Sequence, residues 1–249
     1  MEHGLNIERT VSELHEVWRF DGSRALGPDF WQEMHKLAGS TPADAASVTL
    51  DGGDQFGVGT DLAWLSRGLR RAERQGHSGA LVELGQSARS AFDSLRRLGV
   101  PLFALCTGAV TGASAELASL ADMRLCLGEA RISLPEANLS MLPDFCSIPE
   151  LVASLGGRDA RRCLVLQEVV TASAAEPAPF FDSYPVSREA AMMKIREVSQ
   201  VCARGAVLVE LRQRLRGCGC GSAAEAAEWN EQRVSLQNLV SAVRTMAGE

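Results

Sequence analysis

The sequence predicts an α/β fold built on a parallel β-sheet. Short apolar segments alternate with helical segments over roughly the first 140 of the 249 residues, and helical patterns dominate afterwards. Such alternation is typical of parallel sheets, because parallel neighbours need a crossover connection that a helix usually supplies. Hydrophobic residues make up 46% of the chain, which suffices for one large domain or two small ones.

The first strand and helix are predicted on either side of a turn. Residues 11–21 are mildly apolar and include a predicted strand, which ends at the turn residues Asp21-Gly22-Ser23. A helix is predicted over residues 28–37, because Pro is favoured in a first turn and Phe30 and Met34 recur at helical spacing.

A second strand and two long helices are predicted next. Residues 46–50 form a short apolar strand, and the Gly-rich residues 51–54 end it. Helical patterns then cover about 61–75 and 79–97, and Gly99 suits a helix end. The exposed faces of these helices are rich in arginine, namely Arg67, Arg70, Arg71, Arg74, Arg89, Arg96 and Arg97.

The middle of the chain is predicted to hold three more strands. Residues 100–106 have the short, apolar pattern of a buried parallel strand. A loop of small residues is predicted over 107–114, and a helix rich in Ala and Leu over 115–121. Two short strands are then predicted over 123–127 and 130–134.

The rest of the chain is predicted to be helical around a loop at residues 175–185. Ala, Leu, Glu and Arg recur at helical spacing over residues 148–155, 158–167, 187–216 and 223–246. The last of these segments carries an apolar face suited to a neighbouring copy, formed by Trp229, Leu236, Leu239 and Val240.

Charge and composition argue against several classes of protein. The chain has 25 Lys and Arg against 31 Asp and Glu, a net charge of −6, which disfavours a nucleic-acid partner. No apolar run reaches the roughly 20 residues that span a bilayer, and the N-terminus lacks the pattern of a secretory signal. We therefore expect no membrane partner and a cytoplasmic location.

The cysteines and histidines predict neither disulfides nor a metal site. Cys106, Cys126, Cys146 and Cys163 lie among apolar or small residues, as reduced core thiols do in cytoplasmic proteins. The chain has four His, and none is paired at the spacing of metal ligands, so no metal is expected.

Two loops of small residues lie at predicted strand-to-helix junctions. Residues 57–60 form the first and residues 108–113 the second. Backbone N–H groups at a helix start have no intrahelical partner, and small side chains leave them accessible to an oxyanion. One such loop alone is better interpreted as a tight turn, but two of them near candidate carboxylates favour an oxyanion site.

Glu116 and Glu136 are the candidate acid–base residues. Glu116 lies in the first turn of an otherwise small and apolar helix, where burial disfavours its charged form. Glu136 follows a predicted strand, at the strand end where α/β folds commonly place catalytic groups. The alternatives are a capping Glu116 and a solvated loop Glu136.

Several segments resemble, in order, the motifs of the crotonase (enoyl-CoA hydratase/isomerase) superfamily. Residues 56–62 (FGVGTDL) resemble F-x-x-G-A-D-[LI], and residues 107–118 (TGAVTGASAELA) resemble N-G-x-A-x-G-G-G-x-E-L-A. The later motifs C-D-x-R, F-x-x-P-E and G-x-x-x-A are matched within residues 121–124 (ADMR), 132–136 (ISLPE) and 155–160 (LGGRDA). The order and approximate spacing hold over about residues 15–170.

The resemblance implies an enzyme that acts on an acyl thioester. By position, the N–H groups of Thr60 and Ala113 would hold the thioester oxygen, and Glu116 and Glu136 would handle water and the α-proton. The flanking Gly59, Gly112 and Leu62 would bind substrate. The implied activity is that of an enoyl thioester hydratase or 3-hydroxyacyl thioester dehydratase, a lyase. It needs no cofactor beyond the CoA or phosphopantetheine that carries the substrate.

The sequence also departs from the family pattern. Gly-Gly-Gly becomes Gly112-Ala113-Ser114, the Asn before Gly108 is Thr107, and residues 144–147 replace a Gly-rich stretch. These changes keep two alternatives open. One is a thioesterase, isomerase or decarboxylase on the same scaffold, and the other is a non-catalytic helper subunit.

The long helical stretch 61–106 resembles crotonases that act on long or carrier-bound acyl chains, in fatty-acid-signal or polyketide pathways. Arg67, Arg70, Arg71 and Arg74 would then face the phosphopantetheine or an acidic acyl carrier protein, whereas the alternative is a solvated helix face.

The implied fold is a spiral of parallel strands with surrounding helices. Residues 1–186 would form this crotonase-like core, and residues 187–249 a helical region that builds a homotrimer or hexamer and covers the active site.

Overall fold

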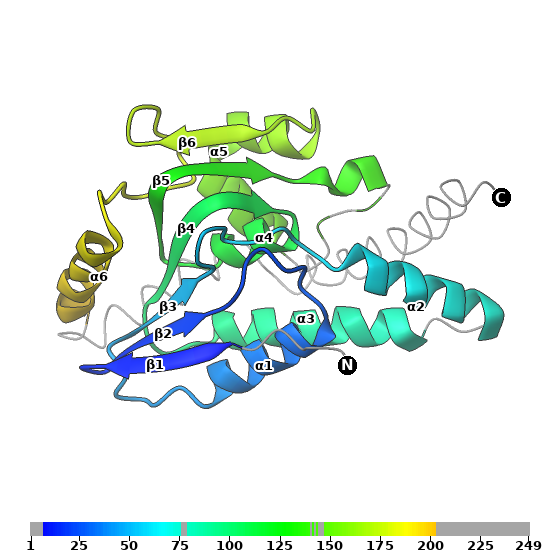
Figure 1. The fold of residues 1–249 in the computed structure, drawn as a ribbon, viewed down its shortest axis with the longest axis horizontal. Helices are drawn as coiled ribbons and strands as arrows, with labels where there is room; N and C mark the ends of the chain where they lie inside the picture. The colour runs from blue at the N-terminus through cyan, green and yellow to red at the C-terminus, as the bar shows by residue number, and fades with distance from the viewer. Residues whose placement is uncertain (1–6, 76–78, 140, 142, 144–146, 203–249) are drawn as a thin grey trace.

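The computed structural model describes residues 7–75, 79–139, 141, 143 and 147–202, and these residues fold around one six-stranded sheet (Figure 1). Each strand pairs with the strand before it in the chain, so the sheet order is β1-β2-β3-β4-β5-β6. The strands are β1 (Glu8–Ser12), β2 (His15–Arg19), β3 (Ser47–Asp51), β4 (Leu102–Thr111), β5 (Met123–Ser133) and β6 (Val170–Ser173).

The centre of the sheet is parallel and its edges are antiparallel. Strands β2, β3, β4 and β5 pair in parallel, whereas β1 and β6 pair antiparallel with their neighbours. Crossover helices connect β2 to β3, β3 to β4 and β4 to β5. The predicted α/β class with a parallel sheet is therefore confirmed.

Helices cover the sheet and continue the chain beyond it. Helix α1 packs along α3, and α4 lies against β4, β5 and α5 (Figure 1). The helices are α1 (Pro28–Gly39), α2 (Leu62–Gln75), α3 (Gly79–Arg96), α4 (Ala113–Ser119), α5 (Ile148–Leu164), α6 (Arg188–Cys202) and the short 3-10 helix η1 (Pro135–Leu139). The predicted helical segments that fall among the described residues are all present, and the break predicted between residues 155 and 158 is a non-helical Gly156 inside α5.

An aromatic cluster anchors the first small-residue loop. The ring centroids of Phe20 and Phe30 lie 5.2 Å apart, and those of Phe20 and Phe56 lie 5.7 Å apart. Trp31 continues the cluster toward Phe92 of α3, with centroids 5.5 Å apart. Phe56 is fully buried and directly precedes residues 57–60, so the core fixes the start of that loop.

The structure corrects the predicted loop at residues 107–114. Strand β4 continues through Thr111, and only Gly112 separates it from α4. The register shifts between Cys106 and Gly108, where Gly108 has φ +59°. This irregularity lets a run of small residues that resembles a loop stay paired with β5.

The strand predicted within residues 11–21 is confirmed as β2, whereas the two strands predicted over residues 123–134 were wrong at their bounds. The two short strands predicted after residue 122 are the single strand β5, which passes through Gly128 at φ +68°. The segment 11–21 holds β2 and the end of β1, joined by a turn at Glu13 and Leu14 that lacks Gly. Strand β6 was not predicted.

Three cysteines are confirmed as unpaired, buried thiols: Cys106, Cys126 and Cys163. Burial raises the pKa of Cys126 and of Cys163 to about 11, and that of Cys106 well above its usual range. These thiols are therefore protonated at neutral pH.

Some predictions fall outside the described residues, namely Cys146, the helix at 223–246 and its apolar face of Trp229, Leu236, Leu239 and Val240. The division into residues 1–186 and 187–249 stays a prediction. No helix in the described ranges has both the length and the apolar character needed to cross a membrane.

Candidate active site

The first small-residue loop is bonded to the far half of β4. The N–H of Gly57 donates to the carbonyl of Ala109 at 2.9 Å, and the N–H of Thr111 donates to the carbonyl of Gly57 at 3.0 Å. Gly57 and Val110 thus form a parallel bridge beyond the end of β3. This bridge brings residues 57–60 beside the turn that begins α4.

Gly59 and Ser114 join the two segments closely. The N–H of Gly59 donates to Ser114 Oγ at 3.2 Å. Gly59 has φ +90°, and a Cβ there would lie 3.0 Å from the carbonyl oxygen of Thr111 and 3.9 Å from the nitrogen of Ala113. Ser114 stands where the family motif has glycine, and sequence analysis did not recognise that its hydroxyl links the two segments.

The predicted oxyanion donors are the N–H groups of Thr60 and Ala113. Leu26 and Thr60 form a parallel bridge whose two hydrogen bonds run from the N–H of Leu26 to the carbonyl of Gly59 and from the N–H of Asp61 to the carbonyl of Leu26. The N–H of Thr60 takes no part in it. Among the hydrogen bonds between described residues, neither Thr60 N–H nor Ala113 N–H acts as a donor. Both groups therefore meet the first requirement of an oxyanion donor.

Glu116 is buried inside α4. Its side chain is 1% exposed, and every residue of this seven-residue helix is buried. Ser147, directly before α5, donates its hydroxyl proton to Glu116 Oε2 at 2.5 Å. Ser119 donates to the main-chain carbonyl of Glu116 at 2.7 Å. Glu116 is thus a buried residue whose carboxylate accepts a hydrogen bond from outside its own helix.

Glu136 reaches the same turn from the next strand. It begins η1 just after β5 and is 9% exposed. A Cβ built on Gly112 would lie 2.8 Å from Glu136 Oε1, so the carboxylate lies against the residue that precedes Ala113. The N–H of Gly112 donates to the carbonyl of Ser133 at 2.9 Å, which ties the end of β4 to the end of β5. The alternative interpretation of Glu136 as a solvated loop carboxylate is therefore wrong.

Leu62 lies at the edge of this arrangement. It begins α2 and is 51% exposed. Asp61 accepts the N–H of Trp64 at 2.7 Å, which caps the first turn of α2. Among the described residues, no three His, Cys, Asp or Glu side chains gather as metal ligands would.

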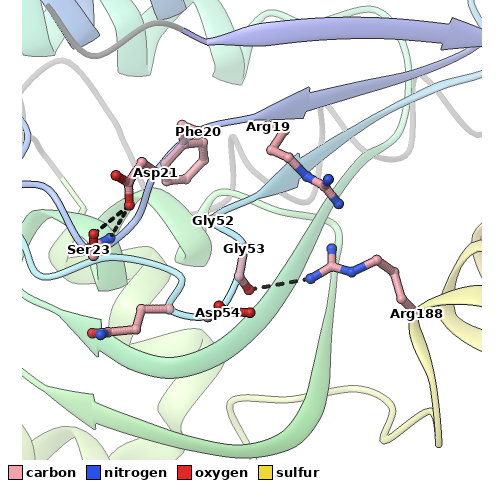
Figure 2. A pocket seen from close by; sticks show the side chains of 9 residues that line it. Arg19, Phe20, Asp21, Ser23, Gly52, Gly53, Asp54 and Arg188 are labelled. Atoms are coloured by element: carbon pink, nitrogen blue, oxygen red, sulfur yellow. Dashed lines mark hydrogen bonds between the residues drawn. The ribbon is translucent and has the colours of Figure 1, made fainter. Parts of the chain in front are cut away.

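A separate cavity of about 560 Å³ lies at the ends of β2 and β3 (Figure 2). Figure 2 shows Arg19 and Arg188 pointing toward one another across it. Both guanidinium groups pair with Asp51, which is 2% exposed, and Arg19 Nη2 lies 3.0 Å from its Oδ2. Because one buried carboxylate binds both arginines, the cluster ties the start of α6 to the sheet.

A family model and several known proteins match the chain. The family model described as Enoyl-CoA hydratase/isomerase matches residues 23–207. The fatty acid oxidation complex subunit alpha of Pseudomonas syringae pv. tomato is 28% identical over 131 residues. That alignment covers 51% of this chain but only 18% of the relative.

Two solved structures have the same fold as this chain. The enoyl-CoA hydratase from Bacillus halodurans is 13% identical with a TM-score of 0.77, and the match covers 96% of this chain and 95% of that one. A Thermobifida fusca YX protein in complex with acetoacetyl-CoA is 21% identical with a TM-score of 0.71, covering 96% and 94%. At these identities the likeness concerns the fold.

Proposed function

Because the chain belongs to the enoyl-CoA hydratase/isomerase (crotonase) family, we propose that it is an enoyl thioester hydratase or 3-hydroxyacyl thioester dehydratase. Its substrate would be an acyl group on CoA or on the phosphopantetheine of a carrier protein. The acetoacetyl-CoA bound by the Thermobifida fusca protein supports the thioester class.

One observation carries the proposal: two glutamates, and two N–H groups that donate no hydrogen bond among the described residues, lie in segments that meet at the turn of Gly112. Gly59 lies against Ala113, Glu136 lies against Gly112, and Glu116 is three residues beyond Ala113 in the same buried helix. These groups come from the ends of three neighbouring parallel strands, where α/β folds assemble their sites.

The donors would act on the thioester carbonyl. The N–H groups of Thr60 and Ala113 would donate to its oxygen, and their bonds strengthen as negative charge develops there. Donors of this kind are worth about 3–4 kcal/mol each in other enzymes. They stabilise the enolate that forms when the β-carbon of an enoyl thioester is attacked.

The two carboxyl groups would transfer the two protons of the reaction. In hydration, the oxygen of water bonds to the β-carbon while one glutamate accepts the proton of that water. The other glutamate delivers a proton to the α-carbon, which completes addition across the double bond. Dehydration follows the same steps in reverse. Glu116 and Glu136 suit these roles because both are buried, Glu116 in the helix that Ala113 begins and Glu136 against Gly112.

The direct test is turnover of a small panel of thioesters. The protein is incubated with 2-enoyl and 3-hydroxyacyl groups of several lengths, each on CoA and on acyl carrier protein, and intact masses are measured. Gain or loss of one water is expected. Release of free acid or carbon dioxide would instead assign the thioesterase or decarboxylase alternative, and an unchanged panel would support the helper-subunit alternative.

The arginine stripe of α2 bears on the choice of carrier. Arg67, Arg70, Arg71 and Arg74 are all exposed, and their spacing of three and four residues places them on one face. The helix begins two residues after Thr60. A positive stripe on a chain of net charge −6 would attract an acidic carrier protein and favour its docking near the site.

We predict that reversing this charge selectively impairs a carrier-protein substrate. In the double variant Arg70→Glu/Arg74→Glu, kcat/KM for the acyl carrier protein substrate should fall about 10-fold or more, and that for acyl-CoA less than about 2-fold. The matched control is Arg158→Glu/Arg161→Glu, because these arginines of α5 are also exposed. Equal kinetics in all three proteins would indicate a solvated helix face.

A further inference from the structure

Ser147 occupies a helix-capping position without capping the helix. It is fully buried at the N-cap of α5, where a serine oxygen usually accepts an N–H of the first turn. No such bond forms here, and Pro149 at the second helical position has no N–H to offer. The hydroxyl donates instead to Glu116 Oε2 at 2.5 Å, across 31 residues of sequence.

This contact favours the charged form of a buried carboxylate. A hydroxyl that donates to a carboxylate stabilises the negative charge. Burial of Glu116 acts in the opposite direction, because it removes water from the charge. The hydrogen bond from Ser147 therefore supports the charged form of Glu116 against the effect of burial.

We propose that Ser147 is a positioning residue that holds the Glu116 carboxylate in its reactive orientation and charge state. The inference rests on the proposed function for its kinetic consequence, although the contact itself does not depend on it. The hydrogen bond fixes Oε2, and with it the plane of the carboxylate relative to the turn at Gly112 and Ala113. The buried hydroxyl thus acts on the reaction through Glu116 without touching substrate.

The test measures the titration of Glu116 directly. Protein labelled with ¹³C at the glutamate side-chain carboxyls is titrated by NMR, and the Glu116 signal is assigned from its loss in Glu116→Gln. In Ser147→Ala the titration midpoint should rise by roughly one to two pH units, because the charged form loses a donor. Ser147→Thr keeps the hydroxyl, so its titration midpoint should stay close to that of the unaltered protein.

Ser119→Ala is the matched control. It also removes a buried hydroxyl bonded to Glu116, but one that donates to the main-chain carbonyl. Its titration should match that of the unaltered protein. If Ser147→Ala does not fold, Ser147→Cys replaces it, since a thiol is a weaker donor of similar size. A Glu116 midpoint that is the same in the Ser147 and Ser119 variants would overturn the inference.

Kinetics separate this inference from the proposed function. In Ser147→Ala, kcat should fall about 10-fold with little change in KM, and the limb of the kcat/KM profile that Glu116 controls should move to higher pH with the titration. If the unaltered protein turns over no thioester while the NMR midpoint still shifts, the hydratase proposal fails and the Ser147–Glu116 contact is supported. If turnover occurs but neither profile moves, Ser147 is only structural.

Discussion

Glutamine in place of Glu116 or Glu136 is expected to lower kcat by about 10²–10⁴-fold, the usual contribution of a general acid or base. The amide keeps the size of the side chain and its capacity to accept a hydrogen bond, but it cannot act as an acid or base near neutral pH. The fall in kcat would be measured in quenched time-course assays with the thioester of the panel that is turned over fastest. The double variant should be little worse than either single variant, because the two residues act in one step.

The control for charge and amide chemistry is Glu150→Gln. Glu150 is a partly buried glutamate of α5 that pairs with Arg96, 2.9 Å away, outside the proposed site. Its kcat should stay within about 3-fold of the unaltered value, since the weakened pair affects stability and not proton transfer. Turnover by Glu116→Gln and Glu136→Gln at the level of this control would exclude the glutamate pair as the acid and base.

The parts of the candidate site that are local in the chain could be predicted from the sequence, and their roles stay predictions. Residues 57–60, the turn at Gly112 and the two glutamates were predicted because each combines a small-residue or carboxylate signal with a strand or helix boundary. The order of these segments along the chain is also visible in the sequence, and it matches the order of the family motifs. Short-range patterns were sufficient here because parallel strands bring their carboxyl ends to one edge.

The contacts between those parts could not be predicted. Ser147 and Ser114 lie where the chain departs from the family pattern, but no local pattern indicates their partners, which lie 31 and 55 residues away. Strand β4 was predicted too short because Gly108 and its small neighbours have the composition of a loop, and pairing with β5 and with Gly57 keeps them extended. The four-residue edge strand β6 similarly depends on its partner.

Replacing Gly112 with alanine is expected to lower turnover strongly and thermal stability only modestly. Gly112 has φ +53° and ψ −125°, a conformation that costs an L-residue about 1–3 kcal/mol. The added Cβ would also lie 2.8 Å from Glu136 Oε1. Displacing the end of a side chain is cheaper than displacing backbone, so the carboxylate should move and the fold should survive. A shift of about 1 Å in a reacting group can cost roughly 10²-fold in rate.

Gly128→Ala separates backbone strain from this displacement. Gly128 has φ +68°, but a Cβ there would meet nothing within 4 Å. Thermal unfolding should therefore show comparable losses for the two variants, whereas only Gly112→Ala should lose turnover. If the loss acts through Glu136, adding Gly112→Ala to Glu136→Gln should cause little further decrease in kcat. A full additional loss would mean that Gly112 acts through the Ala113 N–H instead, since the same methyl group also alters the start of α4.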